Sequence, residues 1–183
     1  TQGYAFYWDA ANNKVVLVGD SKDVKEGWEL LSNNGLGTKV EMSNSDTAGA
    51  DIKNAIRSSS DASPVIITLK EDVTSNNQIS GITGNAAVID LNGKKLTITA
   101  DDPTDPLVYA WKGAKIEIKN GTLVFSGSNQ IGIYNLESSL SLNNVVIESA
   151  TETAVMFKGF SDTSIVDCKI NSTSPWGIAT NSS

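Results

Sequence analysis

The sequence predicts a mainly β protein: a right-handed parallel β-helix, or solenoid, with an N-terminal capping helix, preceded by a small β-hairpin module. From residue 64 onward, aliphatic residues alternate with polar ones, which is the period of strands whose two faces meet different surroundings. Similar segments then recur at intervals of 23 to 27 residues with no helix between them, as in a β-solenoid. The composition agrees, because 19% charged residues and 15 Gly among 183 residues suit short strands joined by turns.

Residues 4–18 predict a β-hairpin, in which an aromatic stretch and an aliphatic stretch flank a polar turn at Asn12 and Asn13. A free hairpin is marginally stable in water, so we expect it to pack on a neighbour. The following segment, residues 25–40, looks irregular and offers three side chains for this packing: Trp28, Leu30 and Leu31. Half of the aromatic cluster should face inward as core, and half should be exposed or docked on the β-helix: Tyr4, Phe6, Tyr7 and Trp8. Residues 1–42 are therefore predicted to form one small module.

Residues 46–60 predict the helix that caps the first coil. Ser45 or Asp46 is the expected N-cap, and apolar residues recur at helical spacing on one narrow stripe: Ala48, Ile52, Ala55 and Ile56. The β-helix is predicted to span residues 46–183. Because residues 175–183 begin another coil, we expect the β-helix to be truncated there, with further coils or another cover over its open edge.

Two apolar columns define the predicted coils. The members of the first lie 27, 24 and 23 residues apart: Leu91, Ile118, Leu142 and Ile165. The second keeps the same intervals: Leu96, Leu123, Ile147 and Ile170. The extra residues of the first interval are assigned to a loop at residues 101–106. Asn120, Asn144 and Asp167 align near a bend, where stacked amide groups are expected to hydrogen-bond between coils and Asp167 to interrupt the ladder.

The composition excludes several classes of function. The sequence contains no His, which removes Ser-His-Asp and Cys-His catalytic arrangements and His-ligated zinc. A net charge of −7, with Arg57 as the only arginine, disfavours nucleic acid as a partner, because phosphates need a basic face. Cys168 has no second cysteine to pair with and is expected to be a small buried apolar side chain. No cofactor is expected.

Two groups of carboxylates could carry chemistry. Asp90 and Glu117 are expected to point outward from consecutive coils within reach of each other, and paired carboxylates can hydrolyse glycosidic bonds. The next two positions of that column are Ser141 and Ser164, so a solvated surface is the favoured interpretation and no catalytic residue is assigned. Residues 101–106 carry three Asp that could hold calcium, but such a segment is more commonly a turn, so no metal site is predicted.

One aromatic residue recurs in each coil, near the strand that precedes the aligned segments: Trp111, Tyr134, Phe157 and Trp176. Exposed rings stacked along a solenoid could form a platform for sugar rings, so these four are the predicted ligand-binding residues. The alternative is that they fill the core or cover its edge. A strand register that differs by one residue decides between the two.

In three stretches the sequence resembles the pectate-lyase-like right-handed parallel β-helix superfamily, and in particular the repeat-rich cell-surface proteins of gut Firmicutes. These stretches are residues 52–60, 65–73 and 88–98, the last with an Asp-Leu-Asn-Gly-Lys run that begins at Asp90. The resemblance covers about residues 46–183 and implies a secreted or cell-wall-attached protein with adhesive or glycan-contacting duties. Lyases of this fold carry a calcium-binding acidic cluster with an Arg or Lys base, and the hydrolases carry Asp clusters with His and Arg. This sequence lacks those motifs.

The sequence therefore favours a non-enzymatic extracellular surface protein whose β-helix is a rigid spacer or an adhesive surface. Its expected partners are glycans or host and cell-surface proteins, with no nucleic acid and no insertion into a membrane. Two alternatives stay open, because fold alone does not decide function. A polysaccharide lyase or glycoside hydrolase would release reducing-end or unsaturated products, and a phage fibre segment would form a stable trimer.

Overall fold

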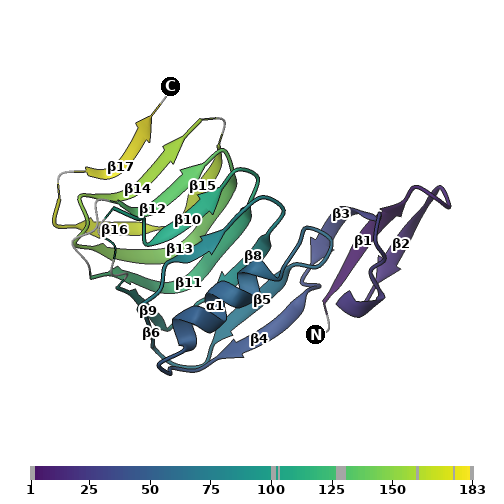
Figure 1. The fold of residues 1–183 in the computed structure, drawn as a ribbon, viewed down its shortest axis with the longest axis horizontal. Helices are drawn as coiled ribbons and strands as arrows, with labels where there is room; N and C mark the ends of the chain where they lie inside the picture. Colours follow the sequence, from purple (N-terminus) through teal and green to yellow (C-terminus); the bar gives the residue numbers. More distant parts are fainter. Residues whose placement is uncertain are drawn as a thin grey trace.

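The main body of the protein is a parallel β-solenoid of about six turns, and a small antiparallel sheet precedes it (Figure 1). The structure is a computed structural model that describes residues 3–99, 102, 104–126, 131–159, 161–174 and 176–181. The predicted fold class, a mainly β solenoid with one α-helix behind a hairpin module, is confirmed.

The N-terminal sheet has three antiparallel strands in the order β2-β1-β3: β1 (Tyr4–Asp9), β2 (Lys14–Val18) and β3 (Glu29–Asn34). The predicted hairpin is β1 and β2, and the segment expected to be irregular supplies β3 after a short 3-10 turn, η1 (Ser21–Asp23). One face of this sheet is buried, with Ala5 and Tyr7 fully covered. The Tyr7 hydroxyl donates a hydrogen bond to the Ala62 carbonyl, which ties the sheet to the bend at residues 61–63.

The strand that follows belongs to the solenoid by its pairing. β4 (Thr38–Met42) hydrogen-bonds in parallel with β5 (Val65–Leu69), whereas the sequence grouped residues 1–42 in the hairpin module. The chain enters β4 at Gly37, where a Cβ would lie 2.6 Å from the carbonyl oxygen of Pro64, so only glycine permits this close approach. The division into a module of residues 1–42 and a β-helix that begins at residue 46 stays a prediction.

The helix, α1 (Ala48–Arg57), is shorter at both ends than the predicted 46–60. Its N-cap is Thr47, so the prediction of Ser45 or Asp46 at this position is wrong. The Thr47 hydroxyl does not cap a backbone N–H but donates to the Asp51 carboxylate at 2.9 Å. Spacing of apolar residues locates a helix well, but several polar residues in a row leave its first residue ambiguous.

Helix α1 covers the N-terminal end of the solenoid, where it lies beside β4 and β5 (Figure 1) and packs against β7 (Ile79–Gly81). Its apolar stripe is fully buried in the core through Ala48, Ile52 and Ile56. The Arg57 guanidinium donates to the carbonyl and hydroxyl oxygens of Ser80, at 3.2 and 2.9 Å, and so fastens the C-terminal turn of the helix to that strand.

Two parallel sheets form the walls of the solenoid. One has the strand order β17-β14-β12-β10-β7, and the other follows the path β15-β13-β11-β8-β5-β4, with β6, β9 and β16 continuing it around a bend. The remaining strands are β6 (Val73–Ser75), β7 (Ile79–Gly81), β8 (Ala86–Asp90), β9 (Lys95–Ile98), β10 (Val108–Trp111), β11 (Lys115–Phe125), β12 (Ile131–Leu136), β13 (Ser139–Ser149), β14 (Thr153–Lys158), β15 (Asp162–Val166), β16 (Lys169–Ser172) and β17 (Trp176–Asn181). Every described pair within the solenoid is parallel, so equivalent side chains of successive coils stack on one another.

The predicted apolar columns are confirmed except at one position. Ile118 pairs with Leu142, and Leu142 with Ile165, while the second column stacks as predicted: Leu96, Leu123, Ile147 and Ile170. Below Ile118, however, lies Ile89 and not Leu91. Leu91 is buried past the end of its strand, because this coil turns through a wider corner in which Asn92 and the next residue both have positive φ, 52° and 74°.

The predicted asparagine ladder is present at the bend of the larger sheet. The Asn144 amide donates to Oδ1 of Asn120 at 3.3 Å, and the Asn120 amide donates to Oδ1 of Asp90 at 3.2 Å. Asn120, Asn144 and Asp167 all have positive φ, 59°, 54° and 52°. Asn and Asp tolerate this left-handed conformation better than other residues with a Cβ, which explains why they recur at the bend.

Replacing Asn120 by Ala is expected to lower the free energy of unfolding by about 2 kcal/mol. Alanine is strained in the left-handed conformation, and it cannot form the ladder hydrogen bonds. Asn120→Gly keeps the conformation without strain and should cost about 1 kcal/mol. Urea denaturation of the two variants measures the difference. If both variants lose the same free energy of unfolding, the strain of alanine at positive φ does not contribute to the loss, and this part of the explanation is wrong.

Candidate functional site

The four aromatic residues predicted as a platform do not share one face. In β10, Val108 and Ala110 are buried, so Trp111 lies on the outer face, and Tyr134 does the same in β12. Phe157 instead pairs with the buried Asn135, and Trp176 pairs with Thr153, which is only 6% exposed. The register therefore gives Phe157 and Trp176 the inward-facing orientation. Trp176 is nevertheless 58% exposed, because β17 is the last described strand of its sheet and no further described coil covers it.

The structure brings a residue that the sequence analysis missed, Tyr109, between the two outward aromatic residues. Its ring lies 5.4 Å from that of Tyr134, with 6° between the ring planes, and 6.2 Å from that of Trp111, with 16° between the planes. Tyr109 and Tyr134 are direct partners in the parallel ladder. We call these three residues the aromatic surface. Tyr109 and Trp111 lie two residues apart on one strand, and that alternation was the available signal.

Aliphatic and charged side chains surround the aromatic surface. On the next coil, Met156 pairs in register with Tyr134. Leu136 pairs with Trp111, and Lys158 pairs with Leu136 one coil further along. The ammonium group of Lys112 lies 5.9 Å from the centre of the Trp111 ring, within the range of a cation–π contact. Trp111 is 40% exposed, which makes its ring the most accessible part of the aromatic surface.

The main chain beside Trp111 is held by hydrogen bonds to neighbouring coils. The N–H of Lys112 donates to the Leu136 carbonyl at 2.8 Å, and the Thr83 hydroxyl donates to the Lys112 carbonyl. These bonds fix the tight turn in which Lys112 has a φ of 42°. The rings are thus presented from a rigid support, and a ligand that stacks on them need not order a loop first.

The two tyrosine hydroxyls of the aromatic surface are neutral at physiological pH. Partial burial raises the pKa of Tyr109, and the neighbouring Tyr134 and Asp105 add to this increase. Burial also raises the pKa of Tyr134, with a further contribution from Glu137. Both phenols therefore stay protonated and are able to donate and accept hydrogen bonds.

The two candidate carboxylates, Asp90 and Glu117, do not stand directly opposite each other. Glu117 pairs in register with Val88, and Asp90 pairs with Lys119, so the two carboxylates stand at different positions along their strands. The Asp90 carboxylate accepts from the N–H of Asn92 at 2.9 Å and from the asparagine ladder, and Oε1 of Glu117 lies 3.8 Å from the Lys119 ammonium. The prediction that Asp90 and Glu117 stand in one row is therefore wrong, because the wide corner after β8 shifts the alignment by two residues, although both side chains lie on the outer face of consecutive coils.

The acidic loop at residues 101–106 is described only in part, since Asp101 and Pro103 lie outside the described residues. The carboxylate of Asp102 accepts from the N–H and hydroxyl of Thr104, at 2.9 and 2.7 Å, and these hydrogen bonds lower the pKa of Asp102. Within the described residues, no group of three or more His, Cys, Asp or Glu is arranged to hold a metal ion. Cys168 packs against the core, partly buried, and its thiol donates to the Val166 carbonyl.

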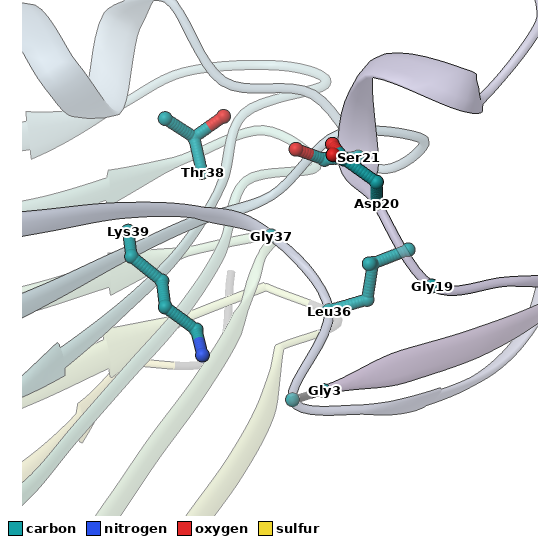
Figure 2. A pocket seen from close by; sticks show the side chains of 9 residues that line it. Gly3, Gly19, Asp20, Ser21, Leu36, Gly37, Thr38 and Lys39 are labelled. Carbon is teal, nitrogen blue, oxygen red and sulfur yellow. The ribbon is translucent and has the colours of Figure 1, made fainter. Parts of the chain in front are cut away.

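A pocket of about 350 Å³ lies where the N-terminal sheet meets β4 (Figure 2). Asp20 and Ser21 come from one side and Thr38 and Lys39 from the other, and the rest of the lining is mostly glycine: Gly3, Gly19, Gly35 and Gly37, with Leu36. The Asp20 carboxylate pairs with the Lys22 ammonium at 3.0 Å, and this contact lowers the pKa of Asp20. The walls are therefore mainly backbone, and the acidic group beside them is already neutralised.

Comparisons with protein families, with characterised proteins and with solved structures found no match. Among the described residues, no helix is long and apolar enough to cross a membrane. The interpretation of the aromatic surface therefore rests on its own geometry and chemistry.

Proposed function

We propose that this protein is a non-enzymatic, extracellular glycan-contacting protein in which the solenoid is a rigid support and the aromatic surface binds sugar rings. The proposal includes secretion or attachment to a cell wall, and membership of the pectate-lyase-like superfamily among surface proteins of gut Firmicutes. The observation that carries the binding function is the set of three nearly parallel rings on one outer face: Tyr109, Trp111 and Tyr134.

Aromatic rings of this kind suit carbohydrate because a pyranose ring has apolar C–H faces and a polar rim. The Trp111 side chain, which is 40% exposed, offers apolar ring surface for such a contact. The Tyr109 and Tyr134 hydroxyls and the ammonium groups of Lys112 and Lys158 can hydrogen-bond the hydroxyls at the rim of the sugar. Few side chains would have to be ordered on binding, because the rings already restrict one another by stacking.

The test is binding of the intact chain to an array of neutral and acidic glycans, followed by titration calorimetry with the glycans that bind. Trp111→Ala is expected to weaken binding about tenfold, since it removes the most exposed ring of the aromatic surface. Tyr109→Ala is expected to weaken binding less, since the Tyr109 ring lies between Trp111 and Tyr134 and mainly holds these two rings in place. The matched control is Trp176→Ala, because Trp176 is 58% exposed but lies off the aromatic surface. This variant should bind as the parent does.

Three results would contradict the proposal. They are the absence of binding to any glycan, unchanged binding of Trp111→Ala, and an equal loss of binding in Trp176→Ala. The enzymatic alternative is measured in the same samples. New reducing ends or unsaturated products, released from a glycan that binds, would contradict the non-enzymatic part of the proposal.

A further inference from the structure

The N-terminal sheet exposes an unusual amount of apolar side chain. Of the nine large apolar residues that are exposed in the described part of the chain, five lie on its three strands: Tyr4 at 44%, Phe6 at 36%, Val15 at 55%, Leu17 at 61% and Leu31 at 52%. Single exposed apolar residues are ordinary on a protein surface, whereas a contiguous group indicates a contact surface.

The strand register places most of these residues side by side. Phe6 pairs with Leu17, and Trp8 pairs with Val15, while the alternate residues face the module's own core. The outer face of β1 and β2 therefore carries five large apolar side chains: Tyr4, Phe6, Trp8, Val15 and Leu17. The centres of the Tyr4 and Phe6 rings lie 5.9 Å apart. Leu31 is the extra residue at the bulge where β3 pairs with β1.

The outer face has a sharp division between apolar and polar strands. The residues of β3 that pair with the outward residues of β1 are polar: Glu29 opposite Trp8, Ser32 opposite Phe6 and Asn34 opposite Tyr4. The apolar part thus covers β1 and β2 and reaches the free edge of β2, which pairs only with β1 among the described strands. β2 contains no Pro and one charge, Lys14, so it lacks most of the features that usually protect an edge strand.

We propose that this outer face is a self-association surface, on which a second copy of the chain packs face to face. A two-fold axis that runs between the facing sheets along the boundary of β1 and β2 would bring apolar strand onto apolar strand and leave both β3 strands at a polar rim. Such a self-complementary patch is the requirement for a symmetric dimer. In Figure 1 the N-terminal sheet extends away from the solenoid, which leaves room for a partner.

The apolar area available is smaller than a stable dimer needs. With about 150–200 Å² for each fully accessible side chain, the four exposed residues of β1 and β2 present roughly 290–390 Å² per copy. A face-to-face pair would bury about twice this apolar area, on the order of 600–800 Å², and would need contacts at the polar rim to reach the roughly 1,000 Å² at which specific interfaces begin. The dimer is therefore a weak one that forms with rising protein concentration.

Sedimentation velocity of the intact chain from about 5 µM to about 1 mM tests the proposal. The average mass is expected to rise from that of the monomer toward twice that value, and Leu17→Lys should keep the monomer mass throughout. Leu17 is largely exposed, so the new charge does not enter the core. The matched control is Val166→Lys, at a 48% exposed apolar position on the solenoid, which should dimerise as the parent does.

The proposal is overturned if the parent chain stays a monomer at all concentrations or forms a trimer. It is also overturned if Leu17→Lys still forms a dimer or if Val166→Lys stays a monomer. Val15→Lys provides a second substitution on the same face, and near-ultraviolet circular dichroism of each variant at low concentration confirms that it is folded. The glycan-binding proposal fails or succeeds separately, because Leu17→Lys leaves the aromatic surface unchanged.

Discussion

Replacement of Ile118 by Ala is expected to lower the free energy of unfolding by about 3–4 kcal/mol, in the middle of the range of about 2–5 kcal/mol for such changes in a core. Ile118 is fully buried and stands between Ile89 below and Leu142 above, which are fully buried as well. The backbones of the three strands are joined by parallel hydrogen-bond ladders. The neighbours therefore cannot close the space that the missing methyl and methylene groups leave.

Two further substitutions separate this cavity effect from any general sensitivity of the strands. Ile165→Ala changes the same column in the last described coil, where the side chain is only partly buried, and should cost about 1–2 kcal/mol. Lys119→Ala changes the outward neighbour of Ile118 and should alter stability by less than about 0.5 kcal/mol. Equilibrium unfolding in urea, followed by circular dichroism and by tryptophan fluorescence, measures all three. Equal costs for Ile118→Ala and Ile165→Ala would refute the cavity explanation.

The stacking of Ile118 on Leu142 and Ile165 could be predicted because a parallel solenoid repeats both the strand period and the coil length in its sequence. The error at Leu91 has a physical cause in the turn that follows. Two consecutive residues with positive φ, Asn92 and Gly93, widen that corner, and spacing alone treats every corner as equal. For the same reason, Glu117 pairs in register with Val88, two residues before Asp90. The alignment of Asp90 with Glu117 in one row came from spacing that ignored this corner.

The aromatic surface could be predicted only in part, because it depends on strand register more than on spacing. Trp111 and Tyr134 point outward as a platform requires, but β14 begins with three buried residues, Thr153, Ala154 and Val155. A run of this kind shows no alternation from which the outward face could be inferred. Phe157 was therefore assigned to the surface although its partner in the ladder is buried.

Replacement of Gly132 by Ala is expected to lower the free energy of unfolding by about 2–3 kcal/mol, because the core has no room for one more methyl group. A Cβ at residue 132 would lie 2.5 Å from Cδ2 of the Phe125 ring and 2.6 Å from the carbonyl oxygen of Ala154. The ring is 1% exposed, and the carbonyl belongs to the backbone of the next coil. Neither can move without disturbing packing or the ladder.

The solenoid supplies a control for this substitution in the same column. Gly177 lies two coils further along, on the other side of Ala154, and a Cβ there would meet only the Ile170 side chain, at 3.9 Å. Gly177→Ala should therefore change the free energy of unfolding by less than about 0.5 kcal/mol. The new methyl group makes a normal van der Waals contact, and alanine lowers the conformational entropy of the unfolded chain. The two variants carry the same chemical change in equivalent strands. If they unfold at the same urea concentration, the glycine in β12 is not required by the Phe125 ring, and the close packing inferred there is wrong.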